Sequence, residues 1–173
     1  MRRLLTILDA GFLFRDNFNR ADGALGSPWT VFSGAFSIES NRLKCVSGGG
    51  AGVTMAKNVS LEAAVTIGTT EAYLTVRRVD SANRVEARLF VDKVRLLKLI
   101  NSVSTVIQDV GITYVAGKKV KLIANGNLFS IFYDGLLKIS PTVIPDAVLQ
   151  TSSVVGVVGT TNSYFDDFVV RRV

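Results

Sequence analysis

The feature that most constrains the fold of this chain is a regular alternation of apolar and polar residues in short runs that end at turn residues. In residues 84–92, apolar side chains at every second position alternate with charged ones, the pattern of a half-buried β-strand. Residues 118–139 hold three strand-like runs separated by Asn125-Gly126 and Asp134-Gly135, dipeptides that favour tight hairpin turns. Helical spacing is weak almost everywhere. The sequence therefore predicts an all-β sandwich or barrel of roughly a dozen strands.

Size and composition favour a single globular domain. The chain has 173 residues, 48% of them hydrophobic and 20% charged, which is enough apolar material to fill a two-layer core. With one cysteine, Cys45, the fold has no internal disulfide and depends on packing. Because Cys45 alternates with Leu43 in a strand-like run, we expect a buried thiol.

Residue usage argues against catalysis. The sequence has no histidine, which removes the commonest general base, metal ligand and Ser-His or Cys-His system. Its glutamates are Glu39, Glu62, Glu71 and Glu86. None has a second acid two to five residues away on the same strand face, and Asp166 and Asp167 should point to opposite faces of a strand. We therefore expect a protein that is not an enzyme and needs no cofactor.

The two ends of the chain carry a resemblance to a known family. Residues 16–29 read DNFNRADGALGSPW and residues 164–170 read YFDDFVV. Together with the hairpins between them, this order resembles the concanavalin A-like lectin/glucanase superfamily, in the laminin-G-like form found in phage virion and minor tail proteins. The resemblance implies an all-β jelly-roll β-sandwich of two antiparallel sheets, formed by residues 15–173 as one domain. This architecture hosts lectins, glycosidases and inert structural modules, so it does not fix an activity.

The opening segment should act as a clasp that joins the chain ends. Phe18 and Trp29 can bury large apolar areas next to Phe165 and Phe168 of the closing strand. Aromatic faces also stack on sugar rings, which leaves two readings for the exposed or half-exposed aromatic residues. The candidate glycan contacts are Trp29, Tyr73, Tyr114 and Tyr164. For Trp29 the competing reading is a core residue with no ligand role.

A calcium site is a further candidate at the clasp. Asp16, Asp166 and Asp167, with Asn17 beside them, would supply oxygen ligands if the chain ends meet. Many relatives within the resembled superfamily hold a structural calcium, although no D-x-D-x-D loop is present here. Turn and capping hydrogen bonds would account for the same residues.

Residues 1–14 precede the family-like start and are strongly apolar. They form either an extra edge strand of the sandwich or an arm that docks on a neighbouring subunit. The residues expected to make such contacts are Leu4, Leu5, Ile7, Leu8, Phe12 and Phe14. Asp9 interrupts the apolar run and no small-x-small cleavage site follows, so we expect no signal peptide. No run reaches the roughly 20 apolar residues of a membrane helix, which predicts a protein made in the host cytoplasm without membrane insertion.

The charge pattern is basic but scattered. The formal net charge is +6, yet the arginines and lysines of 77–98 and 118–121 are mixed with acids and lack interleaved exposed aromatics, so we do not expect nucleic-acid binding. They form either a solvated sheet face or a seat for an acidic partner. The glycine-rich stretch 47–52 should be a flexible turn rather than a phosphate cradle, because no helix follows it.

These observations predict a non-enzymatic bacteriophage virion protein. The expected form is a minor tail protein with a lectin-like module for assembly and host-surface glycan adhesion. Its partners would be other virion proteins and copies of itself in a symmetric oligomer, where many weak contacts add up. One alternative is a capsid decoration protein that stabilises the head shell. Another is a carbohydrate-binding accessory module or degraded glycosidase.

Overall fold

The computed structural model describes residues 11–173, and strands dominate it. The strands are β1 (Phe12–Asp16), β2 (Gly23–Ala24), β3 (Thr30–Glu39), β4 (Arg42–Thr54), β5 (Val59–Thr66), β6 (Ala72–Val76), β7 (Arg84–Leu89), β8 (Lys93–Ile100), β9 (Val103–Gly111), β10 (Lys118–Asn125), β11 (Leu128–Tyr133), β12 (Leu136–Val143), β13 (Val154–Gly159) and β14 (Tyr164–Arg172). A 3₁₀ turn, η1 (Ala147–Gln150), precedes β13. No helix among the described residues is long and apolar enough to cross a membrane.

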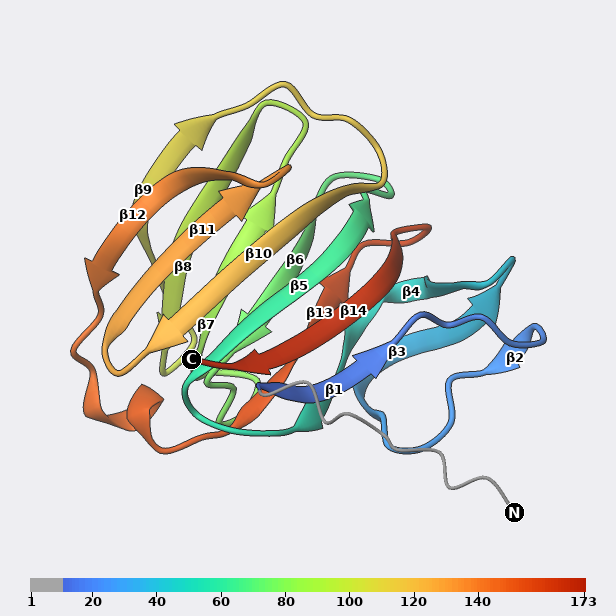
Figure 1. Ribbon diagram of the computed structural model, residues 1–173, viewed down its shortest axis with the longest axis horizontal. Coiled ribbons are helices and arrows are strands. Elements are labelled where there is room, and N and C mark those ends of the chain that lie inside the picture. The colour runs from blue at the N-terminus through green and yellow to red at the C-terminus, as the bar shows by residue number, and fades with distance from the viewer. Residues whose placement is uncertain (1–10) are drawn as a thin grey trace, which may run out of the picture.

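The strands form two packed antiparallel layers (Figure 1). The smaller layer runs β1-β14-β5-β10-β11-β12, and the larger runs β3-β4-β13-β6-β7-β8-β9, with β2 beside β3. Strand β14 links the layers, because Tyr164 and Phe165 pair with both β4 and β5, while its later residues pair with β5 and β1. Strands β5 and β10 pack face to face on β6 and β7. This arrangement confirms the predicted jelly-roll sandwich of two sheets.

The predicted hairpins of residues 118–139 are confirmed as β10, β11 and β12. Alternate side chains of β10 are buried, in register with those of β5 and β11. Gly126, Asp134 and Gly135 all have positive φ, the conformation that tight hairpin turns require. The turn chemistry and the alternation therefore agree with each other, which fixes the register.

The chain ends meet as the clasp interpretation predicts for Trp29 and Phe168. Their ring centroids lie 4.8 Å apart, and Trp29 also packs on Phe14 and Phe18 at 5.9 and 5.6 Å. Strand β1 pairs with β14 at the edge of the smaller layer (Figure 1). Phe12 and Phe14, two residues of the expected docking arm, thus lie in an edge strand. The other four, Leu4, Leu5, Ile7 and Leu8, lie outside the described residues.

The glycine-rich stretch 47–52 is not a flexible turn, as the sequence suggested, but the middle of strand β4. It pairs with β3 on one side and β13 on the other. A Cβ on Gly52 would lie 2.3 Å from the carbonyl oxygen of Val155 and 2.9 Å from the ring of Phe32. Glycine is needed here because neighbouring chains and the Phe32 ring approach the backbone too closely for a side chain.

The run 84–92 forms a shorter strand than predicted. Strand β7 ends at Leu89, and Val91, expected on the buried side, is exposed in the turn that follows. Glu86, expected on the solvent side, is fully buried because arginines cover it. The next segment is strand β8 rather than helix, and β9 pairs with it along the layer edge. Cys45 is a buried free thiol, as predicted.

Candidate functional site

The main pocket lies on the outer face of the larger layer, opposite the core. A row of residues crosses this face in register: Gly50 of β4, Val158 of β13, Tyr73 of β6 and Arg88 of β7. Alternation places their side chains outward while the flanking residues fill the core. The row therefore crosses four strands, of which β4 and β13 are distant in sequence from each other and from the β6–β7 hairpin.

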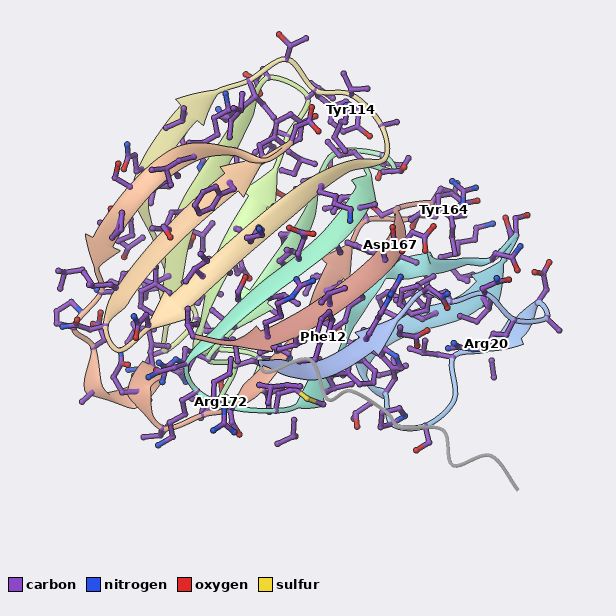
Figure 2. All side chains as sticks on the ribbon, viewed as in Figure 1. Phe12, Arg20, Tyr114, Tyr164, Asp167 and Arg172 are labelled. Atoms are coloured by element: carbon purple, nitrogen blue, oxygen red, sulfur yellow. The ribbon has the colours of Figure 1, made fainter. Side chains whose placement is uncertain are left out.

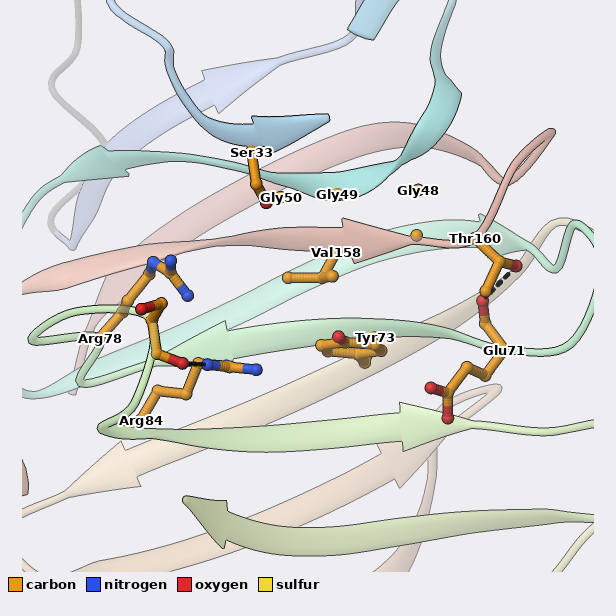
Figure 3. A pocket seen from close by; sticks show the side chains of 12 residues that line it. Ser33, Gly48, Gly49, Gly50, Glu71, Tyr73, Arg78, Arg84, Val158 and Thr160 are labelled. Carbon is orange, nitrogen blue, oxygen red and sulfur yellow. Dashed lines mark hydrogen bonds between the residues drawn. The ribbon is translucent and has the colours of Figure 1, made fainter. Parts of the chain in front are cut away.

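The pocket has a volume of about 330 Å³, at the lower end of the roughly 300–1,000 Å³ typical of small-molecule sites. It is lined by Ser33, Gly48, Gly49, Gly50, Glu71, Tyr73, Arg78, Ser81, Arg84, Val158, Gly159 and Thr160. Figure 3 shows Arg78 and Arg84 at one end, Tyr73 in the middle, and Glu71 with Thr160 at the other end. Two arginines and a glutamate thus lie at opposite ends of the lining.

Glycine backbone forms the wall that β4 contributes. A Cβ on Gly49 would lie 2.1 Å from the carbonyl oxygen of Ser33, so glycine permits β3 to close on β4. A Cβ on Gly48 would have its nearest neighbour at 3.8 Å, the carbonyl oxygen of Gly159. The volume of the pocket at this wall therefore exists because Gly48 carries no side chain.

Arginines hold both carboxylates of the site. Glu86, fully buried, receives Nε of Arg84 at 2.5 Å and Nε of Arg88 at 2.6 Å. Glu71 receives Nη1 of Arg88 on both oxygens, at 3.1 and 3.3 Å. These charge-assisted bonds keep each carboxylate occupied as a structural anion. Glu86 has no exposed surface, whereas Glu71 lines the pocket.

Several polar groups of the lining, by contrast, have no hydrogen-bond partner in the described part of the chain. Within residues 11–173, the hydroxyls of Ser33, Tyr73 and Ser81 and the guanidinium of Arg78 make no side-chain hydrogen bond. Burial and the nearby negative charge of Glu86 raise the pKa of Tyr73, so its phenol stays protonated and can donate. The pocket therefore offers both donors and acceptors to a ligand rich in hydroxyl groups.

The structure places the four predicted glycan contacts in different parts of the molecule. Tyr73 lies in the pocket, with Arg88 stacked 4.7 Å from its ring centroid. Trp29 is 8% exposed, and its indole N–H donates to Oδ2 of Asp16 at 2.9 Å. The structure does not support Trp29 as a sugar contact, because aromatic neighbours cover its ring in the clasp.

Tyr114 and Tyr164 are not part of the main pocket lining and lie near the C-terminal end of β5, where Tyr164 pairs with Thr66 (Figure 2). The hydroxyl of Tyr114 accepts the amide N–H of Ile67 at 2.9 Å. That of Tyr164 donates to Glu39 at 2.9 Å, while Arg42 covers the ring at 4.3 Å. Both tyrosines are thus occupied by contacts within the fold.

The aspartates of the predicted calcium site are also occupied or differently arranged. Asp16 accepts hydrogen bonds from Arg20, Trp29 and the amide of Phe18. Across residues 11–173, no three acidic, cysteine or histidine side chains are grouped to hold a metal. Asp16 thus makes a turn hydrogen bond with Phe18 and an ion pair with Arg20, contacts of the kind named as the alternative to a calcium site.

The expectation that Asp166 and Asp167 point to opposite faces is wrong. A bulge in β14 shifts the register after Asp166, and Asp167 has a φ of 48°. Both therefore line one small pocket beside Arg42, because an inserted residue breaks the alternation. Burial and the charge of Asp167 raise the pKa of Asp166.

Sequence reasoning missed most of the main pocket. It treated Arg78 and Arg84 as part of a scattered basic set and residues 48–50 as a turn. The only signal for the arginines was their position around the hairpin of residues 79–83. Nothing local showed that β3, β4 and β13 would be brought beside this hairpin by long-range pairing.

Comparison with known proteins gives the fold but no family. A scan against protein-family models and a search of curated proteins found no match. Among solved structures, a carbohydrate-binding module, CBM66 from Bacillus subtilis, superposes with a TM-score of 0.68 and 18% identity, covering 86% of this chain and 98% of that one. A non-specific endo-β-1,3(4)-glucanase of family GH16 has a TM-score of 0.64 and 10% identity, covering 93% and 90%. The CBM2 module of the evolved Dit of Lactobacillus casei BL23 phage J-1 has a TM-score of 0.60 and 10% identity, covering 95% and 98%.

These likenesses and the layer arrangement define the class of fold. The chain has the concanavalin A-like jelly-roll fold, shared by carbohydrate-binding modules, glucanases and galectin-like proteins. Its pocket lies on an outer sheet face that offers hydroxyls, backbone and arginine. Because this fold carries both binding modules and glycosidases, the task of the chain must be argued from the pocket.

Proposed function

We propose that this protein is a non-catalytic carbohydrate-binding protein that holds a saccharide in the pocket between Gly48, Tyr73 and Arg78. The observation that carries this proposal is the polar lining, in which three hydroxyls, that of Tyr73 among them, and the guanidinium of Arg78 have no hydrogen-bond partner among residues 11–173. Sugars present many hydroxyls in fixed directions, and a rigid sheet face can satisfy them without reorganisation. The carbohydrate-binding module among the structural neighbours supports this reading.

The absence of catalysis is argued from Glu71 and Glu86. A glycosidase needs one carboxyl that donates a proton and a second that acts as base or nucleophile. Here Arg88 binds both glutamates, and Glu86 has no exposed surface through which a substrate would reach it. We infer that these carboxylates position arginines, and that the pocket binds without cleaving.

We further propose that the protein acts in a bacteriophage particle, as a tail component that adheres to host glycans. A module of a phage Dit protein shares this fold over 98% of its own length, and the opening and closing segments resemble phage virion proteins. A pocket for a single sugar unit binds weakly, and repeated copies on a particle would supply avidity. Immunogold labelling of purified phage particles that encode this chain tests the assignment, and unlabelled particles would contradict it.

Binding to an immobilised panel of bacterial cell-wall and capsular glycans tests the saccharide site. The key variant is Gly48→Leu, because the space at its Cβ is open and a leucine would project into the pocket. Gly111→Leu is the matched control. Its Cβ would likewise have a nearest neighbour at 3.8 Å, but Gly111 lies at the end of edge strand β9.

We expect saturable binding by the wild type and by Gly111→Leu, with at least a tenfold loss in Gly48→Leu at unchanged melting temperature. Undiminished binding by Gly48→Leu would move the site elsewhere, for example to the apolar pocket at Leu128, Phe132 and Leu137. Failure of the wild type to bind any glycan at high micromolar concentration would overturn the proposed function.

A further inference from the structure

Arg78 reaches the pocket because the chain reverses its alternation one residue earlier. Arg77 has a φ of 55° and turns its side chain inward, where Nη2 donates to Asn58 at 2.9 Å and to the carbonyl oxygen of Gly126 at 3.0 Å. Arg78 is therefore directed to the outer face, and its amide donates to the carbonyl of Val154 at 3.2 Å. The hydroxyl of Ser152 donates to the carbonyl oxygen of Arg78, so β13 and the residues before it hold the backbone of Arg78.

The Arg78 side chain is positioned without an ion pair. Its guanidinium carbon lies 4.3 Å from the ring centroid of Phe32, a stacking contact that fixes the plane of the group and leaves its N–H edges free. Within residues 11–173, no carboxylate lies within ion-pair distance of Arg78, whereas Arg84 and Arg88 are both paired with glutamates. Within the described part of the chain, the guanidinium of Arg78 therefore has no hydrogen-bond partner at the pocket it lines.

The surroundings of Arg78 favour an incoming anion. Burial lowers the pKa of its guanidinium, and the positive charge of Arg84 lowers it further. Asp80 and Glu86 act in the opposite direction, but within residues 11–173 neither forms an ion pair with Arg78, and Glu86 is already bound by Arg84 and Arg88. Glu71 lies at the opposite end (Figure 3), bound by Arg88. An anion beside Arg78 would gain a bidentate partner and relieve the repulsion between two arginines.

We propose that the saccharide bound by this pocket carries an anionic substituent, a carboxylate, sulfate or phosphate, and that Arg78 is the residue that binds it. This inference rests on the proposed carbohydrate-binding function and specifies its ligand class. The anion would occupy the arginine end, and the hydroxyls of Tyr73 and Ser33 would bind the sugar ring beside it. The three anions share planar or tetrahedral oxygens that a guanidinium binds bidentately, so the experiment separates them.

Calorimetric titration with three matched pairs of saccharides tests the proposal. The pairs are a galacturonic acid trimer and its trimethyl ester, a 6-O-sulfated N-acetylglucosamine glycoside and its unsulfated parent, and a 6-phosphorylated glucoside and its unphosphorylated parent. The variant is Arg78→Gln, which removes the charge and keeps a polar side chain. Arg171→Gln is the control, because Arg171 also stacks on a phenylalanine, at 4.4 Å from the ring of Phe12, but on the other layer.

We expect at least one anionic member to bind ten times or more tighter than its neutral partner. This preference should disappear in Arg78→Gln, persist in Arg171→Gln and weaken with added salt. Equal binding of anionic and neutral members would overturn the inference while leaving the proposed function intact. An anionic preference that survives in Arg78→Gln would assign it to the overall positive charge and also overturn the inference. If no saccharide binds the wild type in this assay or on the glycan panel, the proposed function itself fails.

Discussion

The indole N–H of Trp29 donates to Oδ2 of Asp16 at 2.9 Å, and this bond ties the end of β1 to the residue that precedes β3. Asp16 also receives Nη1 of Arg20 at 2.8 Å and the amide of Phe18 at 2.8 Å. One half-buried carboxylate thus accepts hydrogen bonds from three residues, while the Trp29 ring packs on Phe168 near the C-terminus. The clasp is both a polar network and the seam between the chain ends.

Asp16→Ala should destabilise the fold by about 2 kcal/mol, because it removes charge-assisted hydrogen bonds and leaves the indole N–H of Trp29 without a partner. Trp29 is the single tryptophan of the chain, so its fluorescence reports the change directly. Urea unfolding followed by this fluorescence measures the free energy of unfolding. Asp92→Ala is the control, since Asp92 is exposed and its side chain makes no hydrogen bond within the described residues. Equal stability of the two variants would show that the clasp network contributes nothing.

The lowered pKa of Asp16 predicts how the stability of the fold changes in acid. Burial alone would raise the pKa of Asp16, but the bonds from Arg20, Phe18 and Trp29 outweigh it and lower the pKa below its ordinary value of 3.8. A depressed folded-state pKa stabilises the fold above the unfolded pKa. That contribution is lost as the pH falls below 3.8 through the folded-state value. The stability difference between wild type and Asp16→Ala should therefore be constant from pH 7 to 5 and shrink in acid. A difference that grows in acid would have the wrong sign for this account.

The elements that the sequence predicts well are those whose signals are local. The strands around Asn125-Gly126 and Asp134-Gly135 carry alternation and turn residues that agree, and the resemblance at the two chain ends indicates the jelly roll. The glycine stretch 47–52 was predicted wrongly, because glycine is common both in turns and where two backbones approach closely. Only the positions of Phe32 and β13 in the folded protein distinguish these two cases. The bulge at Asp167 likewise depends on tertiary pairing.

The site was much less predictable than the fold. Tyr73 is the one predicted glycan contact that lines the main pocket. Arg78 could not be singled out from the sequence, because its outward direction depends on its neighbour Arg77. Arg77 has a positive φ, and its own side chain is held by long-range hydrogen bonds to Asn58 and Gly126. The alternation predicted that Glu86 faces solvent. It is instead buried by two arginines that lie on either side of it in the same strand. The sequence pattern does not show which charged side chains will pack over one another.

Glu86→Ala should cost about 3 kcal/mol, because removing one member of a buried ion network leaves the others without compensation. Arg84 and Arg88 would both lose their short bonds to this carboxylate. The measurement is the midpoint of chemical unfolding compared with the wild type. Asp109→Ala is the matched case on the same sheet face. Its pair with Arg95 is about one-third exposed, so its loss should cost roughly 0.5 kcal/mol. If both substitutions cost the same, the buried network is not a principal support of the pocket floor.

Gly156→Ala should destabilise the larger layer by roughly 2 kcal/mol or more, because the new Cβ would lie 2.2 Å from the carbonyl oxygen of Ala51 and the backbone must shift. Gly48→Ala adds the same methyl group to the neighbouring strand where the nearest atom is 3.8 Å away. Its effect on stability should be within about 0.5 kcal/mol. Thermal unfolding of the two variants measures this contrast. Similar losses in both would mean that glycine serves β4 and β13 through chain flexibility and not through close packing. A loss confined to Gly156→Ala would establish that the pocket wall at Gly48 is free to accept side chains, as the saccharide-binding test requires.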